Sequence, residues 1–178
     1  MEGFLLRLSR AIDRLNRWIG KVAAWAIVLA ILVSALNALS RHLLGMTSNA
    51  WLELQWYLFG AVFMLCAAWT MQDNAHVRID VLSSRFSKTT REIIDMFGHL
   101  FFLFPFVALM LWLSAPFFWK AMMSGEMSPN DGGLLLWPAK GLVFIGFAQL
   151  ALQWLSEVIK GGFRLRDLFG PAHDKVSQ

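Results

Sequence analysis

Asp95 and His99 lie four residues apart within an apolar stretch that is predicted to be helical. At this spacing both side chains project from one face of a helix, as a metal-binding pair or a proton relay requires. An ordinary capping or interhelical hydrogen bond uses the same arrangement, and we favour that interpretation. A bis-histidine haem site needs two histidines at one depth on facing helices, but His42 and His76 are predicted to lie outside the hydrocarbon. We therefore expect no cofactor or metal in this chain.

Four further polar residues lie at helix ends on one predicted side of the membrane: Asn37, Arg41, Glu53 and Lys140. Ionisable groups at membrane depth are costly and are therefore candidates for function. A salt bridge or snorkelling at the interface is the explanation we favour. A polar cluster that docks a partner comes second. A transported-ion or proton site comes third, because one acid near the interface makes a poor relay.

Membrane helices must position these residues. Of the 178 residues, 57% are hydrophobic and only 16% are charged, which excludes an ordinary soluble domain. A helix needs about 18–20 apolar residues to cross the hydrocarbon, and four stretches qualify: residues 22–39, 54–71, 93–119 and 134–159. The last two exceed the minimum, so tilt, a proline bend or protrusion from the bilayer is expected. We predict one membrane domain over residues 1–178.

The basic residues indicate the orientation of these helices. They concentrate ahead of the first helix, between the second and third, and after the fourth. Positive charge favours the cytoplasmic side, so both termini are predicted to be cytoplasmic, with residues 161–178 as a tail. Tryptophans fall at both predicted interfaces, as an aromatic belt would. The predicted fold is an all-α membrane protein with four transmembrane helices, N-in and C-in.

An amphipathic segment precedes the first crossing. In residues 1–21, Leu5, Leu8 and Ile12 recur at helical spacing, with arginines elsewhere on the wheel. Asp13 and Arg17 are predicted to pair at i,i+4. We favour a helix lying on the inner leaflet, where anionic lipids attract arginine. The alternative is an extension of the first crossing. A cleaved signal peptide ending near residues 38–40 is a further alternative, but the basic lead is long for one.

Small residues provide packing faces on three of the helices. Close approach at small residues drives helix association in lipid. The third helix instead carries bulky aromatic residues that suit lipid or another membrane subunit. The small residues are Ala26, Ala30, Ser34 and Ala38 on the first helix, Gly60 and Ala67 on the second, and Gly141 and Gly146 on the fourth.

Several function classes find no support in the sequence. No nucleophile elbow, phosphate-binding loop, zinc-protease motif or cysteine pair occurs, so no enzyme is predicted. The basic residues mark helix ends and accompany no recognition motif, so no nucleic-acid partner is predicted. Gly/Pro-interrupted helix pairs of a transporter core are also lacking. The chain is predicted to be an accessory membrane subunit. The alternatives are a free-standing small transporter or the membrane anchor of a redox complex.

The segment that starts at Glu53 and ends in His76-Val77-Arg78-Ile79-Asp80 resembles the small permease subunit of tripartite ATP-independent periplasmic (TRAP) transporters. The four-helix plan and the predicted orientation match that family over most of the chain. The runs 128–133 and 137–140 look like a branch often named for carboxylate and chloroaromatic substrates. Family members commonly carry Glu where this chain has Ala75.

The resemblance implies an uptake system in the bacterial inner membrane. A periplasmic substrate-binding protein would deliver an organic anion to a large permease, which moves it with sodium. The small subunit would contact membrane lipids and the large permease, scaffold that permease, and hold no substrate site. Sodium coupling is expected in the large permease.

Two hypotheses on partner contacts follow from the resemblance. His76, Arg78 and Asp80 are predicted to pair among themselves or with the large subunit, and so to fix the connection between the second and third helices. The outer connections, around Arg41 and residues 47–51 and 126–131, are predicted to contact the binding protein.

Overall fold

The computed structural model describes residues 2–45, 48–73 and 86–169. The helices are α1 Glu2–Ala24, α2 Ala26–Leu44, α3 Asn49–Gln72, α5 Lys88–Gly98, α6 Phe104–Ser124 and α7 Trp137–Phe169, with a π-helical turn, η1, at His99–Leu103. They form four rods that are long and apolar enough to cross a membrane: Glu2–Leu44, Asn49–Gln72, Lys88–Ser124 and Trp137–Phe169. The predicted all-α fold with four membrane helices is confirmed.

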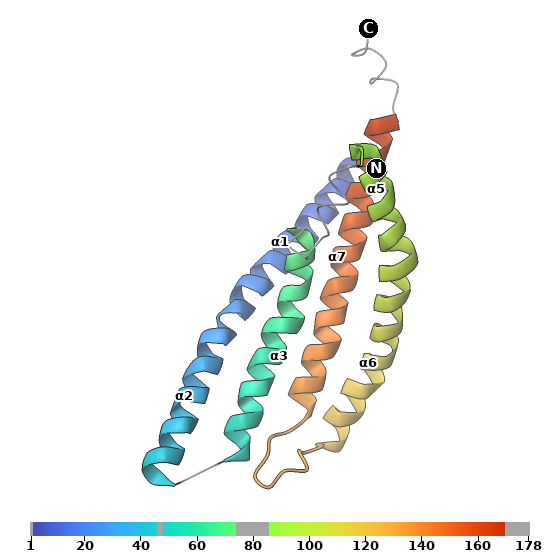
Figure 1. The fold of residues 1–178 in the computed structure, drawn as a ribbon. Coiled ribbons are helices and arrows are strands. Elements are labelled where there is room, and N and C mark those ends of the chain that lie inside the picture. The colour runs from blue at the N-terminus through green and yellow to red at the C-terminus, as the bar shows by residue number, and fades with distance from the viewer. Residues whose placement is uncertain (1, 46–47, 74–85, 170–178) are drawn as a thin grey trace.

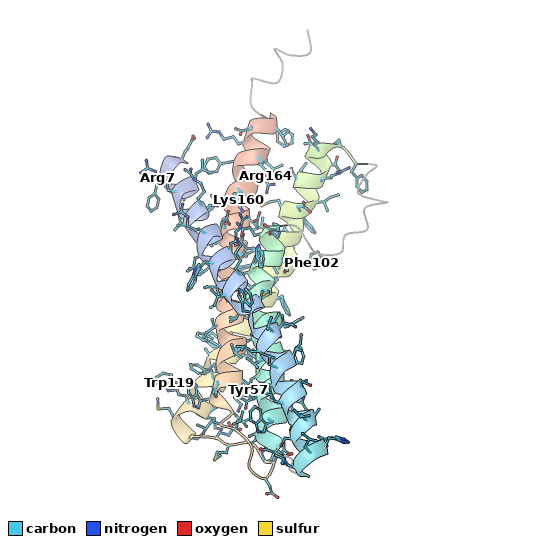
Figure 2. All side chains as sticks on the ribbon, turned by 90° about the vertical axis from the view of Figure 1, so that its left-hand side faces the viewer. Arg7, Tyr57, Phe102, Trp119, Lys160 and Arg164 are labelled. Carbon is cyan, nitrogen blue, oxygen red and sulfur yellow. The ribbon has the colours of Figure 1, made fainter. Side chains whose placement is uncertain are left out.

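The rods lie side by side in an elongated bundle, and the start of α1 and the end of α7 lie at the same end (Figure 1). We call this the terminal end. The opposite end, the hairpin end, carries the turn between α2 and α3 and the connection of residues 125–136 between α6 and α7. Figure 2 places Arg7, Lys160 and Arg164 toward the terminal end, and Tyr57 and Trp119 toward the hairpin end.

The amphipathic segment extends the first crossing. α1 passes into α2 at Trp25, whose carbonyl oxygen accepts hydrogen bonds from the backbone N–H groups of Val28 and Leu29 at 3.1 and 3.3 Å. α1 packs against both α3 and α7, so the separate surface helix that we favoured is not the arrangement found. The physical reason is that the polar face of α1 meets polar side chains on α7. The buried residues of α1 are Ser9, Ile12, Asn16, Gly20 and Ala23.

Glycine allows α7 to approach α3 and α6 closely. A Cβ atom on Gly146 would lie only 2.8 Å from Cβ of Met64 and 3.0 Å from the Met64 carbonyl oxygen. At Gly141 it would meet the Phe118 ring at 3.1 Å. These two predicted packing positions are in close contact, whereas no atom lies within 4 Å of a Cβ on Gly60. The small residues of α7 therefore set the spacing at the centre of the bundle.

The third rod changes helix type midway. In η1 the backbone N–H of Phe104 donates to the carbonyl oxygen of His99, five residues back. Pro105 follows at once, and proline has no N–H and crowds the carbonyl of the preceding turn. Trp154 of α7 fixes this turn, since its indole N–H donates to the His99 oxygen at 2.8 Å and its ring stacks on Phe104 at 4.7 Å between centroids.

The fourth helix is longer than predicted. α7 continues to Phe169, so the first nine residues of the predicted tail at 161–178 are helical. Gly161 is buried there, and a Cβ atom on it would meet only the flexible end of Met96, at 2.7 Å. Helix continues past the apolar stretch because these polar turns pack against α5.

Candidate functional site

Glu53 lies near the start of α3 and is buried, with 4% of its surface exposed. Its carboxylate accepts hydrogen bonds from three donors of the connection between α6 and α7. The Ser128 hydroxyl and the Asn130 side-chain amide, the latter at 2.9 Å, donate to Oε1. The backbone N–H of Leu134 donates to Oε2 at 2.6 Å. Hydrogen bonds to an ionised acceptor are the stronger kind, so this acid clamps the connection onto α3.

Two further side chains of α3 hold the same connection. The Asn49 amide donates to the carbonyl oxygen of Asp131 at 3.0 Å, and the Tyr57 hydroxyl donates to that of Leu135 at 3.0 Å. The connection also turns back on itself at Gly132, which adopts a positive φ of 69°. A Cβ atom on Gly133 would lie 2.8 Å from Oε1 of Glu53. The adjacent glycines are therefore needed for the turn and for the approach of the carboxylate.

Lys140 lies one turn into α7 and has different partners from Glu53. It forms an ion pair with Glu126, and its ammonium group lies 4.2 Å from the centre of the Phe117 ring. Asn37 is buried on α2, whereas Arg41 is exposed in the last turn of that helix. Among the described residues, no hydrogen bond or ion pair joins Asn37 or Arg41 to Glu53 or Lys140. The four predicted residues thus do not form a single bonded cluster.

His76, Arg78 and Asp80 lie outside the described residues. Asp95 and His99 are described, and both line a cavity of about 450 Å³ between α5 and α7. Within the described parts of the chain, no group of three or more histidine, cysteine or acidic side chains is placed to hold a metal ion.

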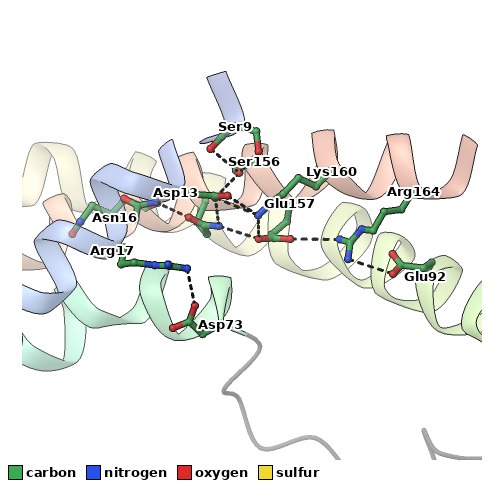
Figure 3. Close-up of polar contacts among 12 residues, drawn as sticks. Ser9, Asp13, Asn16, Arg17, Asp73, Glu92, Ser156, Glu157, Lys160 and Arg164 are labelled. Atoms are coloured by element: carbon green, nitrogen blue, oxygen red, sulfur yellow. Dashed lines mark hydrogen bonds and ion pairs between the residues drawn. The ribbon is translucent and has the colours of Figure 1, made fainter. Parts of the chain in front are cut away.

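A second polar site, which sequence reasoning missed, joins α1 to α7 near the terminal end (Figure 3). Asp13 accepts hydrogen bonds from Ser156 at 2.7 Å, from Gln153 at 3.0 Å and from Lys160 at 3.0 Å. Lys160 also donates to Glu157 at 2.6 Å. Hence one lysine lies between two carboxylates on different helices, and both acids receive further donors. We call this the α1–α7 polar cluster; its members are Ser9, Asp13, Asn16, Gln153, Ser156, Glu157 and Lys160.

Gln153 is central to the cluster because it is fully buried and makes three contacts. Its amide nitrogen donates to Asp13 and Glu157, both at 3.0 Å, and its oxygen accepts from Asn16 at 2.9 Å. The predicted Asp13–Arg17 pair is not formed: Asp13 pairs with Lys160 of α7, and Arg17 pairs with Asp73, just past the end of α3, at 3.2 Å. The sequence does contain a signal for this cluster: polar side chains recur every three or four residues on both helices, which places them on one face of each.

These sites use their charges to join segments of the chain. The carboxylates of Asp13 and Glu53 accept hydrogen bonds from donors on another element, and these contacts hold α1 on α7 and the 125–136 connection on α3. Separating these segments would be costly, because buried polar groups that lose a partner are left unsatisfied.

Comparison with known proteins gives one match. The family model for tripartite ATP-independent periplasmic transporters, DctQ component, matches residues 30–162. The matched part contains α3, α5, α6 and most of α2 and α7, but it leaves out α1. No curated protein and no solved structure matches the chain.

The family match bears on several predictions. Its members are components of a transporter in the inner membrane and are not enzymes, which agrees with the four membrane-spanning rods found here. The predictions that the chain is a transporter component rather than an enzyme, and that it lies in the inner membrane, are therefore confirmed. Because the matched residues are more than half of the chain, the chain belongs to the DctQ family, the small permease component of TRAP transporters.

Proposed function

We propose that this chain is the static scaffold of its transporter. The large permease would carry the organic anion and couple its uptake to sodium, while this chain holds that permease in place. The observation that carries the proposal is that buried polar contacts fasten both ends of the bundle. The α1–α7 polar cluster does so at one end and Glu53 at the other. A subunit that changed shape during transport would have to break these contacts in each cycle, at a cost for every donor left unpaired.

We further propose that the terminal end is cytoplasmic and that the hairpin end faces the periplasm. The basic residues support this orientation. The connection of residues 125–136 would then be presented to the periplasmic binding protein in a fixed shape. Exposed side chains on it, including Met127 and Asp131, are available for contact. The exposed aromatic residues of the third rod, such as Trp112 and Phe102, suit a surface that meets lipid or the large permease.

A reversible cross-link tests the scaffold role. The hydroxyl oxygens of Ser9 and Ser156 lie 2.7 Å apart on α1 and α7, so cysteines at both positions can form a disulfide. The experiment uses the Ser9→Cys/Ser156→Cys chain with Cys66→Ser, co-expressed with the large permease and the binding protein. We expect the oxidised complex to take up its organic anion at the same rate as the reduced complex.

Loss of uptake on oxidation, with recovery after reduction, would contradict a static role. Co-purification tests the partnership itself: an affinity tag on this chain should recover a much larger polytopic protein from the membrane. Recovery of this chain alone would instead favour a free-standing transporter.

A further inference from the structure

The outer surface of α1 carries a stripe of cations. Arginine and lysine recur along it at alternating intervals of three and four residues, which places their side chains on one face of the helix. Figure 2 shows Arg7 on the side of α1 that is turned away from the other helices. All members are exposed, and we call them the basic stripe: Arg7, Arg10, Arg14, Arg17 and Lys21.

Most of the charge on the basic stripe has no partner in the described part of the chain. Arg17 pairs with Asp73 at 3.2 Å, with both side chains nearly half exposed. Arg10 donates only to a backbone carbonyl oxygen, at 3.1 Å. The other three members form no hydrogen bond or ion pair with any described residue: Arg7, Arg14 and Lys21.

The acids of α1 do not neutralise this stripe. Glu2 and Asp13 are the only two acids in the helix. Glu2 pairs with Arg166 of α7, and Asp13 is turned toward α7, where Lys160 holds it at 3.0 Å. The outer face of α1 is therefore strongly basic, and it favours an anionic surface.

Large apolar side chains form a second exposed stripe beside the basic one. They recur at intervals of seven, three and four residues, so they too share one face of the helix. Trp18 is 64% exposed and Leu15 is 46% exposed. We call this the apolar stripe: Leu8, Leu15, Trp18 and Val22. A helix that carries an apolar face beside an arginine-rich face is typical of segments that lie in the interface of a membrane.

The position of both stripes along the first rod places them at the edge of the hydrocarbon. The first crossing is predicted for residues 22–39, directly after Lys21. From Lys21 back to Arg7 the helix rises by about 21 Å, at about 1.5 Å per residue, whereas one headgroup layer is roughly 5–8 Å thick. An upright rod would thus hold Leu8 in water. A tilted rod keeps the whole apolar stripe against lipid.

We propose that the outer face of α1 lies on the leaflet at the terminal end, with the basic stripe on the phosphates of anionic phospholipids and the apolar stripe among their acyl chains. Lipid fits both stripes because it presents an anionic layer directly above an apolar one, and each basic side chain near the surface adds to the attraction. This leaflet is the inner one under the orientation proposed above. The family match begins at residue 30, so this surface lies outside the matched part of the chain.

Fluorescence quenching by brominated lipids tests the proposal in the complex with the large permease. A fluorophore is attached at Leu15→Cys or, separately, at Leu8→Cys, and the other cysteines of the complex, including Cys66, are replaced by serine. Vesicles of phosphatidylcholine and phosphatidylglycerol carry bromine on the acyl chains of one lipid at a time. We expect both positions to be quenched, with a local preference for phosphatidylglycerol of about fivefold, as one basic contact would give. Both leaflets contain the same lipids, so the result does not depend on the orientation of the bundle.

Charge variants of the basic stripe show whether it causes this preference. Arg14→Gln/Lys21→Gln breaks no described contact and should bring the two lipids close to equal. The matched control is Lys88→Gln/Arg91→Gln, which removes the same charge from exposed positions of α5 at the same end and should keep the preference. Arg14→Lys/Lys21→Arg retains the charge and should keep it too.

Three outcomes would overturn the proposal. Equal loss of the preference in both glutamine variants would show general attraction to the membrane surface, and an unchanged preference in Arg14→Gln/Lys21→Gln would show that the stripe binds no anionic lipid. The absence of quenching at both labelled positions would show that protein or water covers the outer face of α1. None of these results bears on the scaffold role, which the cross-link between α1 and α7 tests separately.

Discussion

At the scale of the residue, the buried polar side chains do most to explain this molecule. Gln153 touches two acids and one amide on two helices, and Glu53 collects three donors from a connection about 80 residues further along the chain. Each is surrounded by groups that would be left unsatisfied if it were removed. The free energy at stake lies in those orphaned partners more than in the contacts themselves.

Replacing Gln153 with leucine should lower the free energy of unfolding by about 1–3 kcal/mol, because Asn16, Asp13 and Glu157 each lose a buried partner. Unfolding by urea or sodium dodecyl sulfate in detergent micelles measures the change. The matched control is Leu152→Gln, which places an amide on the exposed neighbouring position of α7. An unchanged midpoint for Gln153→Leu would mean that the α1–α7 polar cluster does not stabilise the fold.

In a double-mutant cycle, Asn16 and Gln153 should couple by about 0.5–2 kcal/mol.

Replacing Glu53 with glutamine should loosen the 125–136 connection. The three partners of the carboxylate are all donors, so the new amide nitrogen must face a donor in place of an acceptor. We expect several-fold faster cleavage of the connection by an added protease, with the helices left intact. Glu2→Gln, which removes an exposed acid paired with Arg166 at the other end, should not change the cleavage rate. The clamp would be refuted if both variants were cleaved like the wild type.

At the scale of the element, contact between helices is decided by which small residue faces a neighbour. Gly146 and Gly60 belong to predicted packing faces, yet only Gly146 lies against another backbone. Sequence alone could not separate them, because spacing defines a face but not what covers it. Gly60 borders an apolar hollow between α3 and α7, which is also lined by Trp56, Tyr57, Met64 and Leu142.

Gly146→Ala should destabilise the bundle by about 1–3 kcal/mol, since its new methyl group would overlap the Met64 backbone and force α7 away from α3. Gly60→Ala makes the same change on α3 in open space. It should be neutral or slightly stabilising, because alanine is the better helix former. Melting of the purified chain in detergent compares the two directly. Equal melting temperatures would show that the close approach at Gly146 is unimportant.

The sequence predicted the existence of all four rods but not their ends. Apolar runs indicate where lipid surrounds a helix, so the apolar part of each rod was predicted correctly. Beyond those runs the helices continue through polar turns such as that of Lys160, whose charge is satisfied by acids on α1 and α7. By hydropathy alone, such polar helical turns cannot be distinguished from surface loops. The partner of Asp13 was missed for the same reason: it lies 147 residues away, and only the packed bundle brings the two together.

At the scale of the whole molecule, the chain is a long bundle with a clamp at each end. At about 1.5 Å per residue, the rods Glu2–Leu44, Lys88–Ser124 and Trp137–Phe169 extend well beyond the roughly 30 Å of a bilayer's hydrocarbon, whereas Asn49–Gln72 is only slightly longer than it. The polar cluster and the cavity between α5 and α7 can therefore lie at the level of the headgroups. The clamped connection lies at the opposite end of the bundle.

Reporter fusions test the orientation of the bundle. Alkaline phosphatase inserted after Asp131, in the clamped connection, should be active because it would lie in the periplasm. The same enzyme fused after Phe169, at the end of α7, should be inactive because it would remain in the cytoplasm. A cytoplasmic reporter such as green fluorescent protein should give the opposite pattern at both sites. Reversed signals would invert the assignment of the terminal end and remove the support for periplasmic docking at residues 125–136.

The pairing of α1 with α7 has a consequence for biosynthesis. α1, which carries Asp13 and Asn16, is synthesised long before their partners on α7. Until translation passes residue 160, Asp13 therefore lacks the lysine with which it pairs in the folded bundle. A chain truncated in α7 before Lys160 would leave the Asp13 carboxylate on α1 without this partner. We expect quality-control proteases to recognise such a subunit by the unpaired acid.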